Sequence, residues 1–97
     1  YSGGAPAAAN TTITVGAYHI VCVVFNGASS SLRADNSAKT TGNPGAVGMG
    51  GFTLAAKASA AAFSNILVKE VVIFSAAHDD TTQSSVITAL NNALTVF

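Results

Sequence analysis

The acidic residues are the first place to look for chemistry, because paired carboxylates can act as acid and base. The chain has four of them, Asp35, Glu70, Asp79 and Asp80. Glycoside hydrolysis needs two carboxyl groups about 5–10 Å apart across a cleft, and nothing in the spacing of Glu70 and Asp80 requires them to meet. Asp79 and Asp80 precede a helical pattern, so helix capping explains them better than acid–base catalysis.

Calcium is a metal ion whose oxygen ligands this sequence could supply in part. A calcium ion takes six to eight oxygen ligands, mostly carboxylates and carbonyls. The candidate ligand or calcium contacts are Asp35, Asn36, Asp79 and Asp80, but they do not form a dense acidic loop. We therefore predict no cofactor, and we keep calcium at these four residues as the alternative.

Histidine and cysteine are too few to build a structural zinc site, which takes four such ligands. Cys22 is the single cysteine, and the two histidines are His19 and His78. Cys22 lies in an apolar run, which predicts a buried, unreactive thiol, and His19 adjoins that run as a structural imidazole. No Gly-x-Ser-x-Gly elbow accompanies the serines. We predict that the chain is not an enzyme and has no catalytic residue.

The charge content restricts the partners. Charged residues make up 8% of the chain, against about 25% in ordinary globular domains, and four basic residues balance four acidic ones. Such a chain has no field to attract nucleic acid. The longest apolar run, Ile20–Phe25, is too short to span a membrane. The predicted partners are other protein subunits of an assembly, or the rest of the chain's own parent polypeptide.

Two apolar runs predict the strands that would position these side chains. Tyr18–Phe25 is β-branched or aromatic at nearly every position, which is typical of a strand buried on both faces. Asn26-Gly27 is a strong turn signal, so we expect a hairpin that continues into Ser30–Asp35. Ile66–Ser75 predicts the second strong strand.

The sequence predicts that the chain divides into an N-terminal segment and a folded part. Residues 1–12 are rich in Gly, Ala, Ser and Thr without any period, and predict a flexible or loop-like N-terminal segment. Residues 13–97 form the folded part, in which Thr40–Gly51 predicts a glycine-rich loop and Phe52–Ala56 a further strand.

The C-terminal stretch predicts a helix over about 80–95. Asp80 and Gln83 have the spacing of a capping box, in which two side chains satisfy amides of the first turn. The apolar residues that follow recur every three or four positions: Val86, Ile87, Leu90 and Leu94. This period predicts one apolar stripe on a helix of about four turns.

Two stretches resemble the concanavalin A-like, laminin-G-like jelly-roll superfamily. The first is Tyr18-His19-Ile20-Val21-Cys22-Val23-Val24-Phe25-Asn26-Gly27, followed by Leu32-Arg33-Ala34-Asp35-Asn36. It is similar to the family's W-H-x-V-A-x-x-F-D-G … L-Y-V-N-G hairpin. The second comprises Gly50-Gly51, Phe63-Ser64-Asn65-Ile66 and Lys69-Glu70-Val71-Val72-Ile73-Phe74. It is similar to I-G-G … F-x-G-x-I-x-E-V-x-I-Y. Tyr18 stands in place of the usual Trp, and Asn65 in place of the usual Gly.

The resemblance implies an all-β fold, an antiparallel β-sandwich of the jelly-roll type with one C-terminal α-helix. The match covers roughly residues 18–94 and corresponds to the C-terminal part of such a domain. We therefore expect residues 13–97 to form an incomplete sandwich, whose missing strands lie elsewhere.

The same family offers three hypotheses on function, since its members include lectins, adhesion modules, glycoside hydrolases and virion proteins of tailed phages. The hydrolase strand Glu-x-Asp-x-x-Glu is absent here. The leading hypothesis is a non-catalytic structural or adhesion module of a virion, in a tailed-phage capsid or tail, or of a surface assembly. This hypothesis locates the chain in a virion or at an extracellular surface. The alternative is a secreted carbohydrate-binding, lectin-like module with surface glycans as partners, and the third is a fragment of a glycan-acting enzyme.

Overall fold

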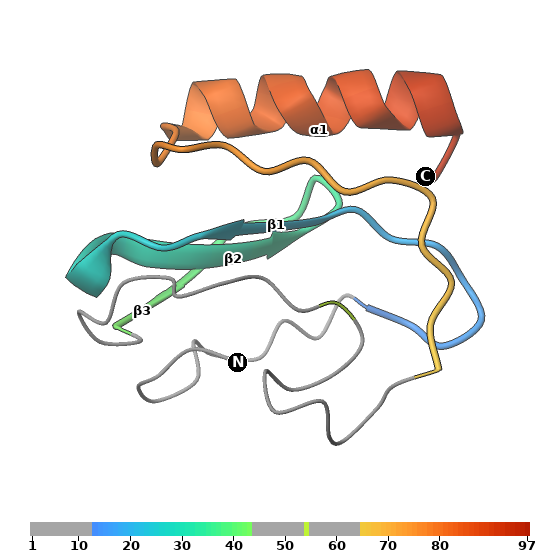
Figure 1. The fold of residues 1–97 in the computed structure, drawn as a ribbon, viewed down its shortest axis with the longest axis horizontal. Coiled ribbons are helices and arrows are strands. Elements are labelled where there is room, and N and C mark those ends of the chain that lie inside the picture. Colours follow the sequence, from blue (N-terminus) through green and yellow to red (C-terminus); the bar gives the residue numbers. More distant parts are fainter. Residues whose placement is uncertain (1–12, 44–53, 55–64) are drawn as a thin grey trace.

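The fold is a small antiparallel sheet covered on one face by a helix (Figure 1). The structure, a computed structural model, describes residues 13–43, 54 and 65–97. Its elements are β1 (Val21–Val24), the 3-10 turn η1 (Gly27–Ser29), β2 (Ser30–Ala34), β3 (Thr40–Gly42) and α1 (Asp80–Leu94). The strands form one sheet in the order β1-β2-β3, and each neighbouring pair is antiparallel.

The predicted hairpin is confirmed, with β1 shorter than expected. Gly27 takes a left-handed φ of 52°, which glycine adopts at little cost. The Ser30 hydroxyl accepts the Asn26 amide at 2.8 Å and donates to the Gly27 carbonyl at 2.7 Å. These bonds close the connection and set the register, in which Val24 lies opposite Ser31 and Val21 opposite Ala34.

The two faces of the sheet differ in polarity. Cys22 and Arg33 lie opposite one another, and both contact side chains of α1, so their face is the one under the helix. Val21 and Val23 alternate with Cys22 and lie on the other face. They are 50% and 46% exposed. The prediction that this strand is buried on both faces is therefore wrong for the face away from α1.

The strand β3 lies inside a stretch that the sequence predicted to be loop. Thr40 pairs opposite Leu32 and Gly42 opposite Ser30. The pairing follows from the short turn after β2, which brings the chain back along the same edge. The rest of the predicted Thr40–Gly51 loop, nearly all of the predicted Phe52–Ala56 strand, and residues 1–12 lie outside the described residues.

The predicted β-sandwich of jelly-roll type is wrong. The described residues form one three-stranded sheet and one helix, not two packed sheets. The predicted strand Ile66–Ser75 is not a strand: the chain bends at Lys69 and at Ser75, and its later part passes between β1 and α1 in Figure 1 without ladder hydrogen bonds to either. Its β-branched composition gives strand propensity, but a strand also requires a paired neighbour for its amides and carbonyls.

The predicted C-terminal helix is confirmed, but its capping differs from the predicted box. Asp79 is the N-cap, and its carboxylate accepts the Thr82 amide at 2.8 Å. The Gln83 side chain instead donates to the His78 carbonyl at 2.7 Å. The predicted pairing of Asp80 with Gln83 was thus one residue out of register with the true cap.

The buried side of α1 is centred on Gln83 and Ile87, whereas Val86 is only half-buried. The stripe is displaced because α1 packs on the polar face of the sheet, where Gln83 meets Cys22. Among the described residues, the buried apolar side chains are Ile20, Ala34 and Ile87, so this part of the chain has a small core.

Candidate functional site

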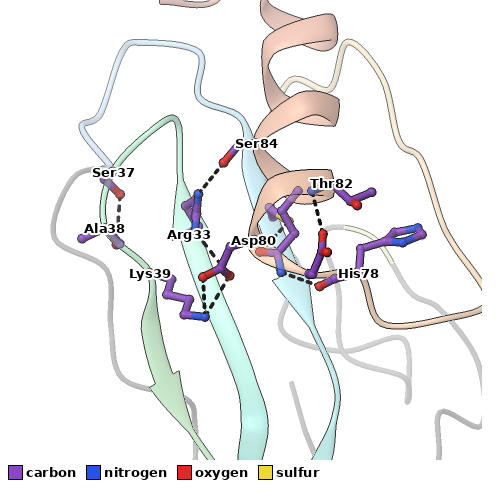
Figure 2. Close-up of polar contacts among 11 residues, drawn as sticks. Arg33, Ser37, Ala38, Lys39, His78, Asp80, Thr82 and Ser84 are labelled. Atoms are coloured by element: carbon purple, nitrogen blue, oxygen red, sulfur yellow. Dashed lines mark hydrogen bonds and ion pairs between the residues drawn. The ribbon is translucent and has the colours of Figure 1, made fainter.

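A polar cluster joins the start of α1 to β2 and to the chain before β3 (Figure 2). Lys39 Nζ donates to both carboxylate oxygens of Asp80 at 2.8 Å each. Arg33 Nη1 donates to Ser84 Oγ at 3.0 Å, and Arg33 Nη2 lies 3.7 Å from Asp80 Oδ1. We refer to Arg33, Lys39, Asp80 and Ser84 as the helix-start cluster.

The charged side chains of this cluster are buried to different extents. The Arg33 side chain is 10% exposed, whereas that of Asp80 is 55% exposed. Arg33 Nε is buried without a hydrogen-bond partner. A buried charge is costly unless an opposite charge accompanies it, and Asp80 is the carboxylate that the structure places beside Arg33. The cluster therefore holds α1 in place on the sheet.

A shallow polar hollow lies beside the cluster, between the end of the sheet and the start of α1. It is lined by Asn26, Ser29, Ser31 and Lys39 on the sheet side and by residues 77–81 and Gln83 on the helix side. Its carboxylates are already engaged. Hydrogen bonds from Thr82, first from its side chain and then from its amide, lower the pKa of Asp79. His78 also lines the hollow, and its buried Nε2 has no hydrogen-bond partner among the described residues.

A second cluster, which we call the His19 clasp, comprises Thr14, His19 and Asp35. His19 Nδ1 lies 2.7 Å from Asp35 Oδ2, and Asp35 Oδ1 accepts the Ile20 amide at 2.9 Å. His19 Nε2 accepts the Thr14 amide at 3.0 Å and lies 3.2 Å from the Thr14 hydroxyl.

A hydroxyl, an imidazole and a carboxylate in this order resemble a catalytic triad, which is recognised by geometry and roles. In the His19 clasp, however, the Nε2 lone pair accepts the Thr14 amide. It is therefore not free to take the hydroxyl proton. The clasp joins the chain before β1 to the end of β2, where Asp35 adopts a left-handed φ of 51°. The structural role predicted for His19 is confirmed.

The four predicted calcium contacts do not come together. Asp35 belongs to the His19 clasp, and Asn36 follows it as an exposed residue. Asp79 caps α1, and Asp80 belongs to the helix-start cluster. No group of three or more His, Cys, Asp or Glu side chains that could hold a metal ion occurs within residues 13–43, 54 and 65–97.

Cys22 lies half-buried between the sheet and α1. Its thiol donates to Gln83 Oε1 at 3.9 Å. Burial raises the pKa of this thiol, and the nearby Arg33 offsets part of the rise. Because the thiolate is the nucleophile and the metal ligand, the geometry fits the predicted unreactive thiol.

The feature that the sequence analysis missed is an exposed apolar surface along the Ile66–Phe74 segment. Every residue from 65 to 77 is exposed, and Leu67 is 80% exposed. The other large apolar side chains of the segment are about half exposed: Ile66, Val68, Val71, Val72, Ile73 and Phe74. The run of apolar residues at both odd and even positions was visible in the sequence, but we interpreted it only as a strand.

The two charged residues of this segment differ in their contacts. Lys69 Nζ donates to the Leu94 carbonyl at 3.1 Å and lies 4.4 Å from the centroid of the Tyr18 ring. A cation at this position is favourable, because carbonyls at a helix C-terminus carry partial negative charge. Glu70 makes no hydrogen bond or ion pair with the described residues. The segment thus presents one carboxylate amid apolar side chains, with no partner in the part of the chain that the structure describes.

Comparison with known proteins gives no assignment: no family model, curated protein or solved structure matches the chain. The resemblance to concanavalin A-like domains therefore stays a prediction from the motifs. Among the helices that the structure describes, none is long and apolar enough to cross a bilayer.

Proposed function

We propose that this chain is a non-catalytic structural module that packs against other protein subunits of a larger assembly. The observation that carries the proposal is the exposed apolar side chains of the Ile66–Phe74 segment, together with Val21 and Val23 of β1 and Phe25 just after it, which are about half exposed. Apolar patches larger than a few hundred Å² are uncommon on monomers and mark interaction sites.

The low charge of the chain supports the same role. Only 8% of the residues are charged. Moving a charged side chain into an interface carries a desolvation cost, and charged residues are depleted from the centres of protein–protein interfaces. A surface that is apolar and nearly uncharged can be buried against a partner with little of this cost.

The contacts of the titratable groups support a role without catalysis. Asp35, Asp79 and Asp80 each accept hydrogen bonds that fix the fold. The His19 imidazole is bonded at both nitrogens. These groups are engaged in holding elements of the fold together.

We propose a virion or an extracellular surface structure as the setting of the assembly. The support for this setting is the low charge and the resemblance of the hairpin motif to proteins of such particles. The fold of the described residues does not bear on it.

The test is to follow the native polypeptide that carries this sequence through density-gradient sedimentation, with antibodies raised against the chain. We expect it to sediment with a large particle and to remain bound in high salt, since an apolar interface is not weakened by ionic screening. Recovery of the polypeptide bound to no other protein would contradict the proposal. Specific retention on a glycan array under the same conditions would favour the carbohydrate-binding alternative.

A further inference from the structure

The hydrogen bonds of the His19 clasp fix which nitrogen of the neutral imidazole carries its proton. A backbone amide can only donate, so the Thr14 amide, 3.0 Å from His19 Nε2, requires a lone pair on that nitrogen. The proton of the neutral ring therefore lies on Nδ1, where it is donated to Asp35 Oδ2 at 2.7 Å. The neutral ring is thus the form that satisfies the Thr14 amide.

A second proton can bind the ring only at Nε2, the nitrogen with the lone pair. The N–H formed there would be directed at the N–H of Thr14. Two donors cannot share a hydrogen bond, so protonation breaks the bond to the Thr14 amide. The Thr14 hydroxyl lies 3.2 Å from Nε2, and its oxygen can accept the new N–H, because a hydroxyl both donates and accepts. Protonation therefore exchanges the amide of Thr14 for its hydroxyl.

The contacts on the other side of the ring survive protonation. Nδ1 still donates to Asp35 Oδ2, and the two side chains, each 15% exposed, then form an ion pair. Asp35 Oδ1 accepts the Ile20 amide at 2.9 Å, and the Asp35 amide donates to the Ile20 carbonyl at 2.7 Å. The imidazolium therefore stays at the end of β2, and the change is confined to the chain before β1.

The chain that the Thr14 amide holds is short and exposed. Ile13 and Val15 are 47% and 106% exposed, and Gly16 has a left-handed φ of 89°. Within the described residues, the hydrogen bonds that tie 13–18 to the rest of the chain are those between Thr14 and His19. Loss of the amide bond therefore leaves this stretch held more weakly.

The charged groups beside the clasp come from two other elements. Asp35, at the end of β2, contacts the imidazole directly. Lys69, from the Ile66–Phe74 segment, lies 4.4 Å from the ring centroid of Tyr18, the residue before His19. Imidazoles ordinarily change charge between about pH 5 and pH 8, a range in which ordinary carboxylates and lysines keep their charges. Histidine is thus the group through which mild acid can act on the clasp.

We infer that the His19 clasp is an acid-operated latch, in which protonation of His19 Nε2 releases the Thr14 amide and loosens residues 13–18 while the β1–β2 hairpin stays intact. The latch is independent of the proposed assembly role, which stands or falls by the sedimentation of the native polypeptide.

The experiment follows the full 97-residue chain, labelled with nitrogen-15, by NMR from about pH 8 to about pH 5. Long-range proton–nitrogen spectra at the upper end should show the His19 proton on Nδ1. As the His19 ring titrates, the protection factor of the Thr14 amide against hydrogen exchange should fall about twofold to tenfold, as expected for one lost hydrogen bond. The Ile20 amide should keep its protection factor, because Asp35 still accepts it.

Three results in the wild-type chain would overturn the inference. The first is a neutral His19 ring with its proton on Nε2. The second is a His19 ring that does not titrate in this range. The third is a protection factor of the Thr14 amide that stays the same on both sides of the His19 titration.

The variants His19→Gln and His78→Gln assign the transition to one histidine. Glutamine can hydrogen-bond but does not titrate. We expect His19→Gln, folded by circular dichroism, to lose the pH dependence of the Thr14 amide, and His78→Gln to keep it. The same transition in His19→Gln, or its disappearance in a folded His78→Gln, would overturn the assignment to His19.

Discussion

The substitution Asp80→Asn tests how α1 is held on the sheet. It removes the carboxylate that faces the buried Arg33 while keeping the size and the helical position of the side chain. Arg33 would then keep its hydrogen bond to Ser84 but lose the counter-charge 3.7 Å from Nη2. We expect a loss of stability, because an unpaired buried guanidinium is more costly than a lost surface ion pair.

The magnitude follows from the distance and the burial. Two unit charges at 3.7 Å attract by about 4–5 kcal/mol at an effective dielectric constant of about 20. Water screens most of this, because the Asp80 side chain is 55% exposed. We therefore expect Asp80→Asn to lower the free energy of unfolding by about 1–2 kcal/mol, including the favourable term of an acid at a helix start. Lys39→Ala breaks a more exposed pair and should cost less than about 1 kcal/mol.

The assay is urea unfolding at pH 7, followed by circular dichroism. Asp79→Asn is a matched control, since it removes a charge from the same helix end, keeps a good N-cap and does not touch Arg33. The interaction energy between Asp80 and Arg33 is measured by repeating Asp80→Asn in an Arg33→Met background. There the loss of unfolding free energy should fall to the part that comes from an acid at the helix start. An unchanged cost in that background, or a larger cost for Lys39→Ala, would refute the role assigned to Asp80.

Three further predictions concern the core and the two ends of α1. Ile87→Ala should lower the free energy of unfolding by about 2–4 kcal/mol, and the exposed Thr88→Ala by no more than about 0.5 kcal/mol, both measured by urea unfolding. The lowered pKa of Asp79 means that its contribution to stability is present above the ordinary pKa of 3.8 and is lost as the pH falls through the folded-state value. Asp79→Ala should therefore flatten the acid limb of a melting-temperature profile, and an unchanged limb would contradict the cap. Lys69→Met should speed amide hydrogen exchange in the last turn of α1, whereas Lys39→Met should not; equal effects would argue against the Lys69 contact.

The elements that were predicted correctly depend on local signals. The hairpin follows from Asn26-Gly27 and the apolar run before it, and α1 from the period of its apolar residues and an acidic cap. Ile66–Ser75 was predicted wrongly as a strand. Its composition indicates strand propensity, but it does not show whether another strand lies beside the segment to pair with it. Whether an extended chain pairs depends on residues distant in sequence, which no local pattern specifies.

The candidate site was predictable in part. The structural role of His19 followed from its place beside an apolar run, although its partner Asp35 was expected as a calcium contact. The helix-start cluster joins Lys39 to Asp80 across 41 positions, and nothing in their spacing predicts that contact. The contact between Lys39 and Asp80 forms because α1 packs on the polar face of the sheet, and no local pattern in the sequence specifies that packing.

The most direct test of the proposed role is amide hydrogen exchange of Ile66–Phe74 in the isolated chain and in the native assembly. In the isolated chain, these amides should exchange nearly as fast as in an unstructured peptide, while those of β2 exchange slowly. In the assembly, the account predicts strong protection of the segment with β2 unchanged. Equally fast exchange of the segment in both states would contradict its role as the surface that receives a partner.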